Sequence, residues 1–93
     1  MNSQPYFNVC ILNWNGGSHL SDCIDSILEN KYSNYRVTVI DNNSKDNSAF
    51  KIDSRVKICR LDKNYGFALG YNLGIDKILS EEDGLGLFSS LMN

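Results

Sequence analysis

Long apolar runs and an excess of one charge are both missing from this sequence. A membrane-spanning helix needs about 18 apolar residues in succession, and no run in the sequence approaches that length. The 9 basic and 11 acidic residues are spread along the chain, which argues against a nucleic-acid-binding stripe and against a polybasic membrane anchor. Residues 1–5 lack a basic segment followed by an apolar one, so we expect no signal peptide and a cytoplasmic location.

Cysteine is scarce and poorly placed for a metal site or a disulfide framework. The three cysteines are Cys10, Cys23 and Cys59, and none forms a C-x-x-C pair. An odd number at such wide spacing favours neither kind of framework. Two of them lie in apolar runs and one on the apolar face of a predicted helix, so we expect all three to be small core residues.

The glycine patterns of the common phosphate-binding loops are also missing. The loop after the first apolar run reads NWNGGS and lacks the G-x-G-x-x-G spacing of a dinucleotide site. No G-x-x-x-x-G-K-[ST] occurs, and the glycines at 84 and 86 precede an expected strand, not a helix. Both standard phosphate-loop fingerprints are therefore disfavoured.

The sequence does contain short apolar runs that alternate with helical patterns. Four runs have the length and composition of strands: 7–12, 35–40, 56–61 and 85–92. Apolar residues recur at helical spacing over 20–28 and 68–79, with Ser18 as the expected cap of the first helix. Residues 48–51 have room for only a short helix. This order predicts an α/β fold, a partial Rossmann-like sheet of about four mostly parallel strands flanked by helices, with 1–93 forming one domain or part of one.

Two local patterns predict how these elements pack. Residues 56–61 alternate apolar and basic side chains, which favours a strand at or near a sheet edge with one open face. Gly70 and Gly74 lie inside the second helical pattern, where each costs about 1 kcal/mol relative to alanine. Close packing of that helix on the sheet is the compensation we expect. Asn72 follows Ala68 by one helical turn, so we expect it in the buried stripe, bonded to strand-end backbone groups or to a ligand.

The central strand delivers an acid to one edge of the sheet. Residues 37–40 are all β-branched and show no polar alternation, so both faces of this strand are expected to be covered. Ligands of open α/β sheets bind just beyond the carboxyl ends of the strands. Asp41 stands at that end and is a candidate ligand contact. A role as a turn residue or helix cap is the alternative.

Amide side chains gather at the other predicted strand ends as well. Asn13 and Asn15 flank Trp14 after the first strand, and further amides follow the second and third strands at Asn42, Asn43 and Asn64. In a parallel sheet these segments converge on one edge, where carboxylates and amides pair with a base or ribose and an indole stacks on it. No basic cradle for phosphate is present, so a metal would have to neutralise phosphate charge. A set of turn-forming asparagines is the other interpretation.

Three ordered motifs give the chain a family resemblance. VCILNWNGG, VTVIDNNSKDNS and NYGFALGYNLGI resemble the N-terminal half of the inverting family-2 glycosyltransferases of GT-A fold. The likeness is to a subgroup that includes rhamnosyltransferase-like enzymes of bacterial polysaccharide synthesis, and it covers residues 7–92. Leu69 and Tyr71 depart from the subgroup pattern, which often has glycine and asparagine there.

The resemblance implies transfer of a sugar from a UDP- or dTDP-sugar to a hydroxyl of a glycan. It assigns nucleotide binding to Asn13, Trp14, Asn15, Asp41, Asn43, Asn64, Gly66 and Asn72. In the family, the strand matched by 85–92 leads to a D-x-D motif that holds Mg²⁺ or Mn²⁺, and a later acid serves as general base. Neither the D-x-D motif nor the later general base is found in this sequence. We therefore expect no metal bound by this chain and no catalytic residue in it.

The expected function is therefore limited to donor-nucleotide binding by a fragment of such an enzyme. Two other classes stay open: a non-catalytic α/β binding or interaction module, and an unrelated nucleotide-binding or regulatory domain. In the family the sheet continues beyond the fourth strand, so we also expect an unpaired edge along 85–92 and self-association through it.

Overall fold

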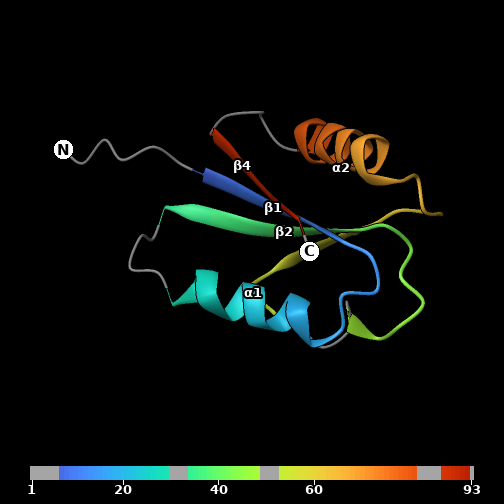
Figure 1. Cartoon of the computed structure of the whole chain (residues 1–93). Helices are drawn as coiled ribbons and strands as arrows, with labels where there is room; N and C mark the ends of the chain where they lie inside the picture. The colour runs from blue at the N-terminus through green and yellow to red at the C-terminus, as the bar shows by residue number, and fades with distance from the viewer. Residues whose placement is uncertain (1–6, 30–33, 49–52, 82–86, 93) are drawn as a thin grey trace.

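The computed structural model describes residues 7–29, 34–48, 53–81 and 87–92. Its elements follow in the order β1 (Phe7–Asn13), α1 (Ser18–Leu28), β2 (Tyr35–Asp41), β3 (Lys57–Arg60), α2 (Phe67–Glu81) and β4 (Leu87–Met92) (Figure 1). The predicted α/β class is confirmed, and the described strand ends lie within two residues of the expected ones. The short helix expected at 48–51 and the start of the fourth strand at 85–86 fall largely or wholly outside the described residues.

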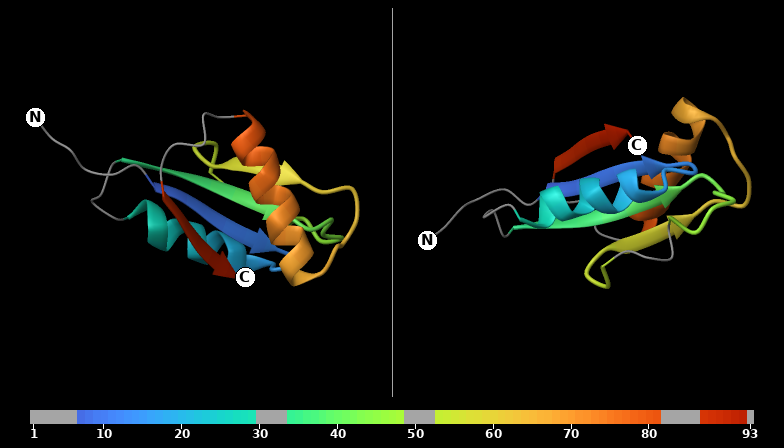
Figure 2. Two further views of the ribbon diagram at one scale, coloured as in Figure 1. Left: turned by 90° about the horizontal axis from the view of Figure 1, so that it is seen from above. Right: turned by 60° about the horizontal axis from the view of Figure 1, so that its bottom comes forward.

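The four strands form one sheet in the order β3-β2-β1-β4, and each neighbouring pair is parallel. In this register Asn13 lies opposite Asp41, and Asp41 lies opposite Arg60. The carboxyl ends of β1, β2 and β3 therefore meet side by side, as predicted. The two helices lie on opposite faces of the sheet (Figure 2). Neither helix, in the part of the chain described, is long and apolar enough to span a membrane.

One face of the sheet is covered by α1. Leu20 and Ile24 of the helix are buried against Ile11, Val37 and Val39 of the strands. This is the apolar stripe that the i, i+4 spacing predicts.

The expected cap of α1 was wrong by one residue. Gly17 occupies the cap position with φ 56°, without a side-chain cap, and Ser18 is the first helical residue. The Gly17 amide instead donates 3.1 Å to a carboxylate oxygen of Asp46, which belongs to the loop after β2. A partner distant in sequence has replaced the local cap, and a positive φ suits glycine at this place.

The other face is covered by α2. Tyr71 and Ile78 pack against Cys10, Leu12 and Ile40, and the Tyr71 hydroxyl donates 3.0 Å to the Cys10 carbonyl. The prediction that the cysteines are small core residues is confirmed for Cys10, which is buried. Cys23 and Cys59 are half-buried and pack against the two apolar clusters.

The two glycines of α2 mark the closest approach of helix and sheet. A Cβ added at Gly74 would lie 2.5 Å from side-chain carbons of Ile40. A Cβ added at Gly70 would lie 2.9 Å from the amide nitrogen of Asn42. The close packing expected from the sequence is therefore confirmed.

The same contact explains where the predicted helical phase was wrong. The buried residues of α2 include Gly70, Tyr71, Gly74 and Ile78, whereas Ala68 and Asn72 are exposed. Helix–sheet contact is centred on the glycine row, which rotates Ala68 and Asn72 toward solvent. The expectation that Asn72 lies in the buried stripe is thus corrected.

Strand β3 forms one edge of the sheet, as predicted. Exposure alternates along it, but its exposed residues are Ile58 and Arg60, whereas Lys57 and Cys59 are half-buried. Its open face therefore carries an isoleucine, 42% exposed, beside the arginine.

Strand β4 forms the other edge and, among the described strands, pairs with β1 alone. Exposed strand edges pair readily with other chains, so self-association remains our prediction. We expect the weight-average mass from sedimentation to rise with protein concentration. A folded chain that stays monomeric across the accessible concentrations would contradict it.

Candidate functional site

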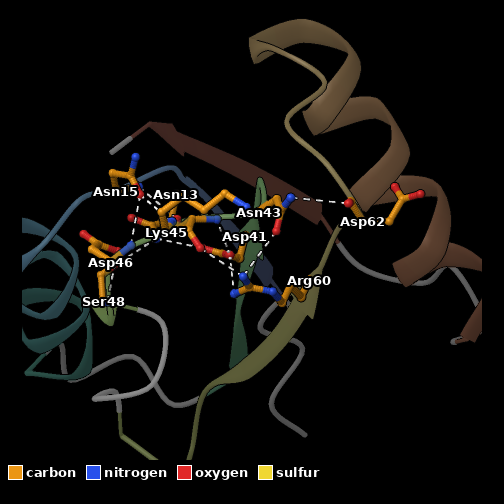
Figure 3. Close-up of polar contacts among 10 residues, drawn as sticks. Asn13, Asn15, Asp41, Asn43, Lys45, Asp46, Ser48, Arg60 and Asp62 are labelled. Atoms are coloured by element: carbon orange, nitrogen blue, oxygen red, sulfur yellow. Dashed lines mark hydrogen bonds and ion pairs between the residues drawn. The ribbon is translucent and has the colours of Figure 1, made fainter.

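Polar side chains from three parallel strands and two loops form a network at the carboxyl edge of the sheet (Figure 3). Asn13, Asp41 and Arg60 end β1, β2 and β3 at neighbouring register positions. The loops after β1 and β2 add further hydrogen-bonding groups. We refer to Asn13, Asn15, Asp41, Ser44, Asp46, Ser48 and Arg60 as the strand-end network.

Asp41 is the centre of this network and is fully buried. Its Oδ1 accepts from Asn13 Nδ2 at 2.9 Å and from the Ser44 hydroxyl at 2.7 Å. Its Oδ2 accepts from the Ser44 backbone amide and from Arg60 Nη1, both at 3.0 Å. An ionised carboxylate has about four lone-pair sites, two on each oxygen, and these four hydrogen bonds occupy them. Asp41 is therefore a turn-forming residue here, and its direct contact with a ligand stays a prediction that requires one of these donors to move.

Arg60 closes the network on the β3 side. Its side chain is 40% exposed while that of Asp41 is 0% exposed. Besides the ion pair, Nη2 donates 2.9 Å to the Ser44 carbonyl and 3.3 Å to Asn43 Oδ1. Sequence reasoning missed this residue. The signal was a basic residue near the end of the expected third strand, which faces Asp41 once the register is known.

Asn13 connects the first two strand ends. Its side chain is fully buried, and its Nδ2 lies 2.9 Å from Asp41 Oδ1, 3.2 Å from Ser44 Oγ and 3.0 Å from Ser48 Oγ. The amide nitrogen is thus turned into the network.

Asn15 fastens the loop after β1 to the loop after β2. Its Oδ1 accepts from the backbone amides of Lys45 and Asp46 at 2.7 and 3.3 Å. Its own amide donates 2.8 Å to Ser44 Oγ, and its φ of 51° is in the left-handed region. Asparagine tolerates that conformation better than most residues.

Asp46 holds the start of α1 and the end of its own loop. It accepts from the Gly17 amide at 3.1 Å, and from the backbone and hydroxyl of Ser48 at 3.1 and 2.6 Å. The hydrogen bond from the Ser48 hydroxyl keeps the pKa of Asp46 below its ordinary 3.8. A carboxylate of the protein thus already meets the positive end of α1, where a phosphate loop would hold phosphate.

Trp14 stands between the two anchored asparagines, and its side chain is 52% exposed. Because Asn13 and Asn15 are both bonded to the second loop, the indole projects from a fixed segment. It is the largest exposed apolar side chain next to the network.

The loop between β3 and α2 is tied to the same edge. Buried Asn42 accepts from the Tyr65 amide at 3.0 Å and donates 2.9 Å to the Gly66 carbonyl. Asn64 Oδ1 accepts 2.8 Å from the Gly66 amide, at a φ of 78° that suits glycine. Asn43, with φ 61°, donates 3.3 Å to the Asp62 carbonyl. The structure thus brings Asn43, Asn64 and Gly66 to this edge and places Asn72 on the exposed side of α2.

A groove of about 610 Å³ adjoins the network between the end of β3 and α2. Its lining consists of Asn43, Arg60, Leu61, Asp62, Tyr65, Leu73 and Lys77. The Tyr65 hydroxyl bonds to the Asp62 carboxylate, which lowers the pKa of Asp62 and raises that of Tyr65. The groove shares Asn43 and Arg60 with the strand ends, so a ligand at the strand ends would contact one wall of it.

The described residues do not fit a divalent metal. Among them there is no group of three or more His, Cys, Asp or Glu side chains that could hold one. The two carboxylates of the network, Asp41 and Asp46, receive N–H and O–H donors on both oxygens, whereas a cation needs free oxygens.

Comparisons with known proteins agree with this architecture. The sequence model described as glycosyl transferase family 2 matches residues 8–81. The chain is 34% identical over 68 residues to the glycosyltransferase GlyG of Streptococcus pneumoniae, covering 67% of this chain and 23% of that protein. It is 28% identical over 81 residues to an uncharacterized glycosyltransferase of Haemophilus influenzae, covering 81% of this chain and 25% of that protein.

A solved structure shares the fold. The mannosyltransferase from Pyrobaculum calidifontis in complex with GDP-Man and Mn²⁺ matches with a TM-score of 0.72 and 18% identity, over 81% of this chain and 25% of that one. The chain thus spans about a quarter of the length of these relatives. Because the family match runs from β1 to the end of α2, this chain belongs to glycosyl transferase family 2.

Proposed function

We propose that residues 1–93 are the N-terminal part of a family 2 glycosyltransferase domain and that this part binds the nucleotide of a sugar donor. The observation that carries the proposal is the strand-end network itself. Three parallel strands end with Asn13, Asp41 and Arg60 side by side, and an exposed indole stands next to them. Ligands of open α/β sheets bind at such an edge.

The chemistry of the edge suits a nucleoside. The exposed face of Trp14 offers a stacking surface for a base. The amide of Asn43 and the outer part of the Arg60 guanidinium offer hydrogen bonds to the polar edge of a base or to a ribose. Asp41 holds that guanidinium in place at 3.0 Å. It would reach a ribose hydroxyl itself only by exchanging one of its present donors.

The remaining predicted residues complete the proposed nucleotide side of the cleft. We assign Asn64 and Gly66, in the loop before α2, to this side, and we include Asn72, which is exposed on that helix. Asn13 and Asn15 contribute by holding Trp14 between them.

The finer identity of the donor and acceptor belongs to the proposal as well. The motifs favour a UDP- or dTDP-sugar, an inverting transfer to a glycan hydroxyl and a rhamnosyltransferase-like subgroup. The solved mannosyltransferase carries GDP-Man and Mn²⁺, so GDP is a third candidate nucleotide. A Mg²⁺ or Mn²⁺ requirement is expected of longer family members, which we place in polysaccharide synthesis on the cytoplasmic side of the membrane. For this chain we propose binding of the nucleotide.

A non-catalytic binding or interaction module is the second candidate. The observation that favours it is the filled carboxylate of Asp41, which makes the network complete without a ligand. Nucleotide binding distinguishes the two candidates, since only the first requires it.

The single tryptophan provides the test. Titration with UDP, dTDP or GDP is expected to change the emission of Trp14 in a saturable way. Replacing Trp14 by alanine is expected to weaken nucleotide affinity, measured by calorimetry, about tenfold or more, because stacking of a base on an aromatic ring contributes about 1–3 kcal/mol.

A matched control is Ile58→Ala. Ile58 is another exposed apolar residue, but it lies within β3, opposite Val39 of β2, and not at the carboxyl end of a strand. This variant should bind as the wild type does. Equal affinity of the Trp14 variant and the wild type would show that the indole is not part of the site.

A further inference from the structure

We propose that Asp46 is a positioning residue, which sets the orientation of Asn13 and Trp14 for the nucleotide without touching it. The inference rests on the proposed function and adds a residue that the expected contacts did not include. Asp46 lies beside Ser48 on the far side of the network from Arg60 (Figure 3). A defined series of hydrogen bonds connects the two sides.

The series begins with the single hydroxyl proton of Ser48. That proton goes to Asp46 Oδ1, at 2.6 Å between the oxygens. With its one proton committed, Ser48 Oγ acts toward Asn13 only as an acceptor, and Asn13 Nδ2 lies 3.0 Å away. Through Ser48, the carboxylate of Asp46 therefore acts together with that of Asp41 to fix which end of the Asn13 amide faces the network.

The orientation of Asn13 matters because its Nδ2 also donates 2.9 Å to Asp41 Oδ1. A flipped amide would place its carbonyl oxygen against that carboxylate, where two acceptors repel. Asp41 in turn holds Arg60 at 3.0 Å. Connected hydrogen bonds in a buried network polarise and strengthen one another. We therefore expect the loss of Asp46 to weaken the hydrogen bonds on the Arg60 side of the network as well.

Asp46 also holds the loop that carries Trp14. Its carboxylate accepts from the Gly17 amide at 3.1 Å and its backbone amide donates 3.3 Å to Asn15 Oδ1. Asn15 has a positive φ of 51°, a conformation that in a residue other than glycine persists where surrounding contacts maintain it. The backbone amide of Asp46 is one of these contacts, and its carboxylate fixes the Gly17 amide in the same loop.

The test compares Asp46→Ala with Asp46→Asn. The asparagine keeps an oxygen for the two Ser48 donors and replaces the acceptor for the Gly17 amide by an NH₂ donor. We expect Asp46→Ala to weaken UDP, dTDP or GDP binding about tenfold, and to change the emission of Trp14 and its quenching by acrylamide before any nucleotide is added. Asp46→Asn should recover most of the affinity.

The matched control is Asp53→Ala. Asp53 also accepts from the backbone and side chain of the residue two positions ahead, with Arg55 bonds of 2.9, 2.9 and 2.7 Å. The hydrogen bond from the Arg55 side chain lowers the pKa of Asp53 to about 2. Asp53 is therefore, like Asp46, a charged carboxylate held by hydrogen bonds from a residue two positions later in the chain. It lies ahead of β3, at the opposite end of that strand from Arg60. Its variant should keep both the affinity and the Trp14 signal of the wild type.

The outcomes separate this inference from the proposed function. If the wild type binds nucleotide and Asp46→Ala binds equally well, the inference is overturned and the function stands. If the wild type binds none, the proposed function fails, and an unchanged Trp14 signal in Asp46→Ala overturns the positioning as well.

A second variant covers the case in which Asp46→Ala does not fold. Ser48→Ala removes the hydroxyl that transmits the orientation and leaves the bond between Asp46 and Gly17. It should lose affinity to a similar extent, and a Ser48→Ala chain with wild-type affinity would overturn the inference.

Discussion

Replacing Gly74 by alanine is expected to destabilise the chain by about 1–3 kcal/mol, the usual range for overpacking a core, although alanine is the better helix former by about 1 kcal/mol. The added methyl would lie 2.5, 2.5 and 2.6 Å from three carbons of the Ile40 side chain. Ile40 is fully buried, and its branched side chain has few rotamers to choose from. The helix would have to move away from the sheet.

Equilibrium urea unfolding measures this effect, with Asp76→Ala as the matched control. Asp76 is exposed on the same helix, so alanine there should leave the free energy of unfolding unchanged or raise it slightly. The double variant Ile40→Ala/Gly74→Ala should be less destabilised than the sum of the single variants, by about 0.5–3 kcal/mol. An unchanged or increased stability of Gly74→Ala would show that helix and sheet are not in tight contact.

Asp41→Ala is expected to lower the free energy of unfolding more than Arg60→Ala does. Removing the acid takes one acceptor from the buried Asn13 amide and leaves the Ser44 backbone amide and hydroxyl without theirs. Breaking a buried charged network from one side typically costs about 3–5 kcal/mol. Removing the arginine leaves Asp41 with three donors and admits water at the exposed side, so we expect about 1–3 kcal/mol, the range for a hydrogen bond to a charged group.

Urea unfolding of the two variants and of the double variant gives the coupling between them. Asp53→Ala, which breaks an exposed ion pair with Arg55, serves as the control and should unfold close to the wild type. If Arg60→Ala is as damaging as Asp41→Ala, the acid is not the centre of the network. The milder arginine variant is also the better one for binding studies, since it is expected to fold and to lose nucleotide affinity.

Much of the fold follows from local patterns, because they are strong here. Each of three patterns predicts one arrangement that the structure contains. The β-branched run before Asp41 forms a strand covered on both faces, the apolar stripe of α1 packs on the sheet, and the two glycines of α2 lie where that helix approaches the sheet most closely. The phase of α2 was harder to predict. Counting apolar residues placed Asn72 inward, but the backbone approach at Gly70 and Gly74 turns the helix, and glycines carry no hydropathy signal for that contact.

The strand-end network was predictable only in part. Parallel strands imply that Asn13 and Asp41 come together, and they do. The partners of Asp41 depend on the register of β3 and on the path of the loop after β2, which local patterns do not fix. Arg60 was therefore missed, and Ser18 was expected as the cap of α1 where Gly17, bonded to the distant Asp46, occupies that position. Both errors involve a hydrogen bond between residues far apart in the sequence.

The most direct measurement is an amide NMR titration of the folded chain with UDP, dTDP and GDP at up to millimolar concentration. Binding at the proposed edge predicts shifts concentrated at residues 13–17, 41–46 and 60–66 and at the indole of Trp14, saturating with at least one nucleotide. A well-dispersed spectrum that does not change with any of the three, or changes confined to the opposite ends of the strands, would contradict nucleotide binding at this edge.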